Sequence, residues 1–263
     1  MLSSSSWTTS AVEEVEESGG LRSLECDLVM KLHTNAMGLT FANPVGLAAG
    51  FDRSGQQAAA LSELGFGHVE IGTVVAGQAA MIDAPRCGSR LGINIGSSRQ
   101  GLDPQVIEDY ATALRAAYES ADYLCANLSS PFAGRDGDTI GVDQLVSRMK
   151  REVEACAARI GRRVPLLIKV EGGFKGSPLP AAIAATRHHG LDGLVLVSTC
   201  LERIAAICQY INGATVISVG GIASGADISA RLGAGASLVQ IYTAFVRDGA
   251  IGLHRMFREF EAL

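Results

Sequence analysis

From residue 43 onward, short apolar runs alternate along the chain with segments in which apolar residues recur at helical spacing. The apolar runs lie at 45–49, 69–74, 91–95, 123–128, 166–170, 194–198, 216–219 and 238–242. Continuous runs of this kind are typical of parallel strands that helices cover on both faces. The pattern therefore predicts eight strands in repeated βα units.

Helix-starting residues follow several of these runs: the capping boxes Ser54 with Gln57 and Ser224 with Asp227, and the N-caps Asp103 and Ser177, each before a proline. Eight parallel strands in a chain of 263 residues favour a closed (β/α)8 TIM barrel, an α/β fold. An open doubly wound sheet is the alternative. The segments 75–90 and 199–215 are short for crossovers, so we expect a low rim there.

Residues 1–36 differ from the rest of the chain. They carry four serines at 3–6, continue with an acidic segment and reach a Gly19-Gly20 pair. We expect a short N-terminal extension over 1–36 and a single barrel domain over 37–263. The low rim leaves room for a second subunit, so the sequence also allows a homo-oligomer.

Composition argues against several classes of function. The formal net charge is −5, which argues against a nucleic-acid partner, and no apolar stretch has the length of a transmembrane segment. The six cysteines lack the spacing of a metal site, and no signal peptide is recognisable. We expect a cytoplasmic protein with no metal.

Candidate chemistry gathers at the ends of the predicted strands. Small residues at 43–50 would let a planar ligand approach the backbone, although close strand–helix packing explains them equally well. Gly220 and Gly221 precede a capped helix after the seventh strand, where barrels bind phosphate. Lys169 is a charge inside an apolar strand, and such a charge is costly to bury unless it meets a ligand. Asn127 ends the fourth strand and is followed by serines, which are also common turn residues.

Taken together, these segments resemble the dihydroorotate dehydrogenases, and in particular the quinone-linked class. The similarity runs from residue 37 to 263 and is densest at 37–52, 65–73, 92–96, 121–131, 220–225 and 235–243. Several long matches in the correct order make a chance resemblance improbable.

The resemblance implies an FMN cofactor, a small-molecule substrate and an electron acceptor that the sequence does not identify. By motif position, the cofactor-binding residues would be Ala48, Ala49, Gly50, Thr73, Asn94, Asn127, Lys169, Gly220, Gly221, Tyr242 and Thr243. Ser130 would be the catalytic base and Lys169 would lie beside the reacting ring. The implied reaction oxidises a ring C–C bond by removing a proton from one carbon and a hydride from its neighbour.

The substrate-binding residues would be Arg53, Phe132, Ser198 and Thr199, and departures from the family pattern cluster on this substrate side. Phe132 and Ser198 stand where the family has asparagine, and two family segments, one rich in asparagine and one rich in glycine, are absent. Fewer amides would weaken binding of dihydroorotate by about 1–3 kcal/mol for each unpaired polar group. The substrate is therefore expected to differ from dihydroorotate.

Two other interpretations are compatible with the sequence. The chain could be a non-catalytic barrel that binds flavin or phosphate and acts through a partner protein. It could also be a flavin-free barrel enzyme that binds a phosphorylated ligand. We favour the FMN oxidoreductase because Lys169, Asn94, Asn127 and Ser130 occur together at strand ends.

Overall fold

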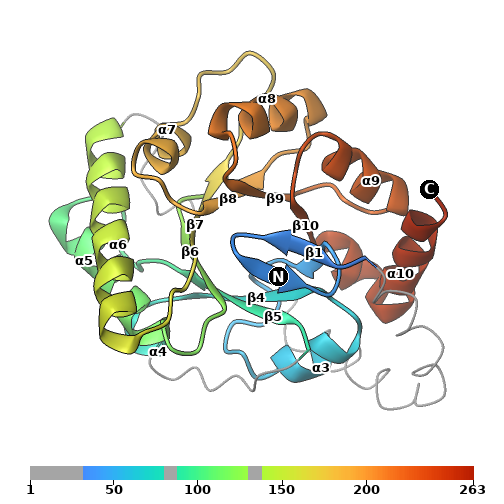
Figure 1. Ribbon diagram of the computed structural model, residues 1–263, viewed down its shortest axis with the longest axis horizontal. Coiled ribbons are helices and arrows are strands. Elements are labelled where there is room, and N and C mark those ends of the chain that lie inside the picture. The colour runs from blue at the N-terminus through green and yellow to red at the C-terminus, as the bar shows by residue number, and fades with distance from the viewer. Residues whose placement is uncertain (1–31, 80–87, 130–137) are drawn as a thin grey trace.

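The computed structural model of the chain describes residues 32–79, 88–129 and 138–263 (Figure 1). Eight parallel strands close into a barrel in the order β10-β3-β4-β5-β6-β7-β8-β9. Their bounds are β3 Val45–Leu47, β4 His68–Val74, β5 Arg90–Ile95, β6 Tyr123–Asn127, β7 Leu166–Glu171, β8 Gly193–Val197, β9 Thr215–Val219 and β10 Leu238–Ile241. The predicted (β/α)8 barrel is confirmed, and all eight predicted strands are present.

Helices surround the barrel (Figure 1). They are α3 Ala58–Glu63, α4 Ala76–Ala79, α5 Pro104–Ala117, α6 Thr139–Ile160, α7 Ala181–His188, α8 Leu201–Ile211, α9 Gly225–Gly233 and α10 Thr243–Glu261. The main apolar core fills the layer between these helices and the outward side chains of the strands. The crossover at 199–215 holds α8, with 11 residues, whereas the described part of 75–90 holds only the four-residue α4.

A hairpin closes one end of the barrel and lies across its centre in Figure 1. It consists of β1 Thr34–Ala36 and β2 Leu39–Phe41, which pair antiparallel across the expected domain boundary at residue 36. Ala36 and Phe41 pack against barrel-interior residues such as Leu167 and Ile217. The backbone N–H of Met37 also donates to Thr215 Oγ1 at 2.9 Å. Because the hairpin plugs this end, the described residues leave the carboxyl ends of the strands as the side where a ligand can enter.

Two of the four predicted helix starts are confirmed. The Asp103 carboxylate accepts from the backbone N–H groups of Gln105 and Val106, and the N–H of Asp227 donates to Ser224 Oγ at 3.2 Å. Both side chains satisfy N–H groups that have no partner inside the helix.

The other two helix starts were predicted wrongly. Before α3, it is the buried Asp52 carboxylate, not the Ser54 hydroxyl, that accepts from the backbone N–H groups of Gly55 and Gln57. Ser177 forms a turn in which its hydroxyl donates to Phe174 O at 2.6 Å, and α7 begins only after Pro180. Local side-chain hydrogen bonds competed with capping at both places.

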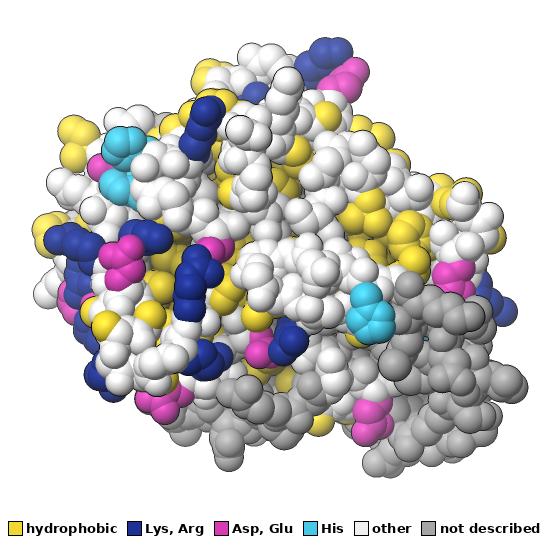
Figure 2. All heavy atoms as spheres, in the orientation of Figure 1, with side chains coloured by type: hydrophobic (Ala, Val, Ile, Leu, Met, Phe, Trp, Pro, Cys, Tyr) yellow, Lys and Arg dark blue, Asp and Glu magenta, His cyan; other side chains and the backbone are white. Residues whose placement is uncertain are grey.

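The outer surface of α5 and α6 carries a network of charges, and blue and magenta side chains gather there in Figure 2. Glu152 is buried and forms ion pairs with Arg115 and Arg148. Both arginines also pair with Glu108, at 2.7 and 3.1 Å. Since the carboxylates and guanidiniums satisfy one another, this surface stabilises helix packing.

Candidate functional site

A cavity of about 390 Å³ opens where the strands end, on the side away from the hairpin. Its wall is formed by residues that follow β3, by the carboxyl ends of β4, β5, β6 and β7, and by α5: Ala49, Gly50, Arg53, Gly72, Thr73, Val75, Gly96, Ser97, Ser98, Arg99, Gly101, Val106, Tyr110, Asn127 and Lys169. This is the face on which barrels of this type bind their ligands, and the volume suits a small molecule.

One wall of the cavity is a continuous chain of hydrogen bonds. Asn127 Nδ2 donates to Thr73 Oγ1 at 2.9 Å, and the Thr73 hydroxyl donates to Asn94 Oδ1 at 2.7 Å. Asn94 is fully buried and lies beneath this wall. The Asn127 carbonyl oxygen Oδ1 accepts from the backbone N–H and the hydroxyl of Ser129. Three polar side chains from three neighbouring strands are thus held in one fixed arrangement.

The chain of hydrogen bonds continues from Asn94 inward to Glu70, which is 1% exposed inside the barrel. Glu70 Oε1 accepts from Asn94 Nδ2 at 2.8 Å. Glu70 Oε2 accepts from Gln240 Nε2 at 2.9 Å and from the Tyr123 hydroxyl at 3.1 Å. Burial, together with the Glu70 charge, raises the pKa of Tyr123 well above its usual value, so this hydroxyl stays protonated and donates.

The cavity has a positive character. Lys169 follows Ile168 on β7, pairs in register with Asn127 of β6 and reaches the cavity wall. Arg53 and Arg99 line the same space, and Arg99 also pairs with Asp109 at 3.2 Å. None of the described residues that line the cavity carries a carboxylate. An anionic or strongly polar ligand is therefore favoured.

The predicted phosphate-binding residues lie at the adjacent ends of β9 and β10. Gly220 and Gly221 have φ values of 110° and 70°, which favour glycine. Arg231 holds this loop from behind, donating to the carbonyl oxygens of Ser198 at 2.5 Å and Gly220 at 2.8 Å. Burial lowers the pKa of Arg231.

The two glycine-rich segments meet through Tyr242. A Cβ atom on Gly50, whose φ is 114°, would lie 3.4 Å from Tyr242 Cε2. Tyr242 precedes Thr243, the first residue of α10, and both side chains are exposed. The strand end after β3 and the start of α10 therefore form adjacent parts of one surface.

The structure brings Ala49, Gly50, Arg53, Thr73, Asn127 and Lys169 together around the cavity. Ala48 and Asn94 are buried below it. Ser198 is also buried, and its hydroxyl accepts from the backbone N–H of Cys200 at 3.2 Å. Thr199 lies next to Gly221, where its Cγ2 would be 3.0 Å from an added Cβ. Ser130 and Phe132 lie outside the described residues, so their roles stay predictions.

Sequence reasoning missed Glu70, although a signal was present. Glu70 interrupts the apolar run 69–74 in the same way that Lys169 interrupts 166–170. The cost of burying an unpaired charge applied to both positions. It also missed Tyr110, whose hydroxyl donates to the Asn127 carbonyl oxygen O at 2.6 Å and whose pKa is raised by burial.

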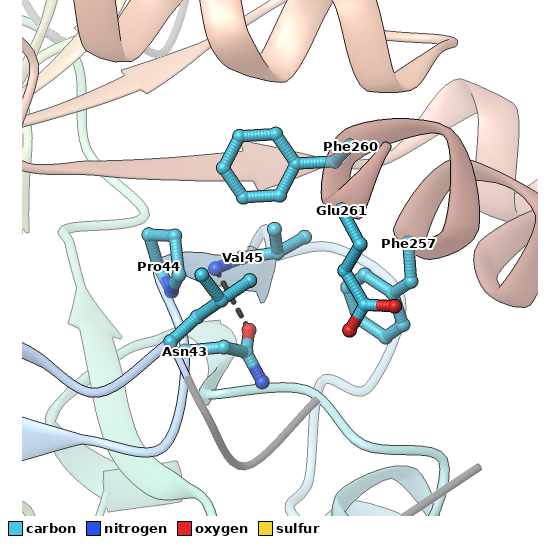
Figure 3. Close-up of a pocket in the computed structure, with 7 residues that line it drawn as sticks. Asn43, Pro44, Val45, Phe257, Phe260 and Glu261 are labelled. Carbon is cyan, nitrogen blue, oxygen red and sulfur yellow. Dashed lines mark hydrogen bonds between the residues drawn. The ribbon is translucent and has the colours of Figure 1, made fainter. Parts of the chain in front are cut away.

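A smaller crevice lies at the opposite end of the barrel, between the start of β3 and α10 (Figure 3). Asn43 and Glu261 are its polar side chains, and Asn43 Oδ1 accepts from the backbone N–H of Val45 at 2.9 Å while Nδ2 donates to Gly65 O at 2.7 Å. Phe257 and Phe260 of α10 supply apolar walls. Asn43 thus fixes the chain before β3.

Among the described residues, no helix is long and apolar enough to cross a membrane. Within the same ranges, no three His, Cys, Asp or Glu side chains are grouped as they would be around a metal ion.

The closed barrel, with a cationic and hydrogen-bonding cavity at the carboxyl ends of its strands, defines the chain as a (β/α)8 barrel with a ligand site where enzymes of this fold have their active sites. A family model described as dihydroorotate dehydrogenase matches residues 31–90 and 179–263. The dihydroorotate dehydrogenase (quinone) of Flavobacterium lutescens is 34% identical over 282 residues, which cover 83% of this chain and 81% of that protein. The protein of the same name from Stenotrophomonas maltophilia is 33% identical, covering 84% of this chain and 81% of that one.

A solved structure agrees in fold. The crystal structure of DHODH in complex with ferulenol from Eimeria tenella superimposes with a TM-score of 0.79 at 22% identity, covering 96% of this chain and 89% of the other. The chain belongs to the dihydroorotate dehydrogenase family and is an oxidoreductase. The matched ranges of the family model leave out 91–178, which supplies Asn94, Asn127 and Lys169.

Proposed function

We propose that the protein is an FMN-dependent dehydrogenase that oxidises a C–C bond of a small cyclic substrate related to dihydroorotate and passes the electrons to a quinone. The observation that carries this proposal is the cavity in which Lys169, Thr73 and Asn127 converge. The names of the relatives, dihydroorotate dehydrogenase (quinone), support the choice of substrate and acceptor class.

The residues present fit FMN. Gly50 has a φ of 114°, and its missing side chain leaves the Tyr242 ring uncovered, so a flat ring can approach the backbone there. Thr73, Asn127 and Lys169 offer hydrogen-bonding groups to the polar edge of such a ring. Gly220, Gly221, Tyr242 and Thr243, at neighbouring strand ends, would hold the phosphate. Bound FMN would supply a two-electron acceptor for the hydride.

The protein's own residues would bind and orient the substrate. Lys169 is a cation at the end of a core strand and would stabilise negative charge that develops on the bound ring system. Arg53 is exposed on the same wall and can pair with an anionic group of the substrate. Ser130, which the family resemblance makes the proton acceptor, would need a site closed to water to act as a base.

The substrate is expected to be related to dihydroorotate rather than bound through the same ring of amides. Among the substrate-side positions, Ser198 is buried and is not among the residues that line the cavity; its hydroxyl accepts from the Cys200 N–H and its carbonyl oxygen accepts from Arg231. Arg53 keeps a positive charge at the cavity wall. An anionic ring compound with fewer hydrogen-bonding groups than dihydroorotate fits these residues best.

An anaerobic redox titration tests the proposal. The protein is loaded with FMN, and its absorbance is followed while dihydroorotate and then other cyclic substrates with a saturated C–C bond are added. We expect substrate-dependent bleaching of the flavin bands and their return when a quinone is added. Lys169→Met should bleach much more slowly at equal flavin occupancy. FMN that binds but is bleached by none of these compounds would favour the non-catalytic alternative.

A further inference from the structure

The buried Glu70 carboxylate has no part in the chemistry proposed above, yet it is connected to the cavity by hydrogen bonds. It lies inside the barrel, and Asn94 Nδ2, Gln240 Nε2 and the Tyr123 hydroxyl each donate to it, as does the neighbouring Cys125 thiol. An ionised carboxylate can only accept hydrogen bonds. Each of these neighbours must therefore turn a donor toward Glu70.

Gln240 shows how strongly this requirement acts. Its Nε2 is directed at Glu70, and its carbonyl oxygen Oε1 is left buried with no hydrogen-bond partner. A buried unpaired oxygen costs free energy, and turning the amide over would place that oxygen against a carboxylate. Gln240 therefore leaves its Oε1 unpaired, because its Nε2 donates to Glu70.

The same requirement passes outward through Asn94. Because Asn94 Nδ2 faces Glu70, its oxygen Oδ1 faces Thr73 and accepts the Thr73 hydroxyl proton. With its proton committed, the Thr73 oxygen can only accept, and it does so from Asn127 Nδ2. Asn127 Oδ1 then accepts from Ser129. Every hydrogen bond in the chain points toward Glu70.

We propose that Glu70 is a positioning residue whose carboxylate sets the hydrogen-bond direction of the Asn94–Thr73–Asn127 chain. The cavity wall then presents an acceptor at Thr73 and a donor, the second Asn127 amide proton, beside it. Such a wall recognises a ligand edge with an N–H group next to a carbonyl oxygen, the pattern of a cyclic amide. The inference rests on the proposed function, since the ligand used to test it is FMN.

Glu70→Leu removes the acceptor while keeping a side chain of similar size. Asn94 then loses its orientation, Thr73 can turn its proton into the cavity, and we expect FMN to bind about tenfold more weakly. Glu70→Gln should bind FMN within about twofold of wild type, because Gln240 can turn over and offer its unpaired oxygen to the new amide.

The experiment is a double-mutant cycle in FMN affinity, measured by quenching of flavin fluorescence, with Asn94→Leu as the second change. If Glu70 acts through Asn94, the double variant should bind FMN no more weakly than Asn94→Leu alone. Glu152→Leu is the matched control. It removes a buried carboxylate that lies on α6, away from the cavity, and should lower the melting temperature without changing FMN affinity. A general loss of structure would instead make the two effects on affinity add.

A further pair of variants keeps the test decisive if Glu70→Leu does not fold. Gln240→Met removes a different donor to Glu70 and should leave FMN affinity within about twofold, whereas Asn94→Leu should lower it about tenfold. Equal losses in these two variants, or full affinity in a folded Glu70→Leu protein, would overturn the inference alone. A wild-type protein that binds no FMN would overturn the proposed function and this inference together.

Discussion

The two sides of the barrel interior are built from different chemistry. On the side of β4, β5, β6 and β10, the inward side chains include His68, Glu70, Asn94, Tyr123 and Gln240. On the side of β7, β8 and β9 they are Leu167, Val195, Ile217 and Val219, with Lys169 of β7 reaching the cavity above them. The apolar side tolerates exchange of one hydrocarbon for another, whereas each polar group depends on a particular partner. The polar side is also the one that continues into the cavity wall.

The largest expected effect comes from crowding the polar side. A Cβ atom on Gly92 would lie 2.2 Å from Tyr123 Cζ, so Gly92→Ala must displace the ring that donates to Glu70. We expect the free energy of unfolding to fall by about 3 kcal/mol in urea denaturation. Gly233→Ala is the control, because nothing lies within 4 Å of its Cβ position, and its stability should stay within about 0.5 kcal/mol. Equal effects in the two variants would show that Tyr123 moves freely.

Acid should weaken the polar side through His68. This imidazole is fully buried between Phe41 and Tyr123, neither ring nitrogen has a partner, and burial lowers its pKa from 6.5 to about 3. The unfolded chain binds a proton below pH 6.5 and the folded chain does not, so stability falls as the pH drops from 6.5 toward 3. Between pH 7 and pH 5 this one group should remove about 2 kcal/mol.

The measurement is urea unfolding of wild type and His68→Leu at both pH values. Wild type should lose about 2 kcal/mol more than the variant over this interval. Replacing the exposed His188 by Leu should leave the pH dependence as it is in wild type. A pH dependence that His68→Leu does not change would mean that His68 is protonated in the folded state.

The smallest expected effect comes from removing one hydroxyl on the polar side of the barrel and adding one on the apolar side. Thr73→Val leaves Asn94 Oδ1 without its donor, and Val195→Thr places a hydroxyl where the neighbours are apolar. Each nearly isosteric exchange should cost about 1.5 kcal/mol of unfolding free energy. Stability unchanged in Thr73→Val would show that the hydrogen-bond chain contributes nothing to the fold.

The strands could be predicted because each strand is an apolar run in the sequence, even where its inward side chains are polar. Outward residues such as Val69, Ile71 and Ile93 are apolar because they pack in the outer core. Lys169 and Asn127 were found at the cavity because both lie at strand ends, where parallel strands share one edge. Asn94 could not be placed from sequence, since a strand-end amide can face a ligand or lie beneath it. A hydrogen bond between neighbouring strands decided this, and Glu70, 24 positions earlier in the chain, supplied the partner.

Only two of the four helix starts were predicted correctly, because the other two involve acceptors that the expected motif does not contain. Ser224 and Asp103 act within one turn of their own helices, so the local pattern was sufficient. The turn before α3 depends on Asp52, whose buried carboxylate gathers several backbone N–H groups and leaves Ser54 no capping role. An acceptor outside the expected motif satisfied the same donors.

The central claim is that the polar side of this barrel ends in a site for a phosphorylated flavin. The most direct test is an equilibrium titration of flavin-free protein with FMN and with riboflavin, followed by fluorescence. We predict that FMN binds at least about tenfold more tightly than riboflavin, because only FMN carries the phosphate that Gly220, Gly221 and Thr243 are proposed to hold. Equal affinity for the two compounds, or binding of neither, would contradict the account.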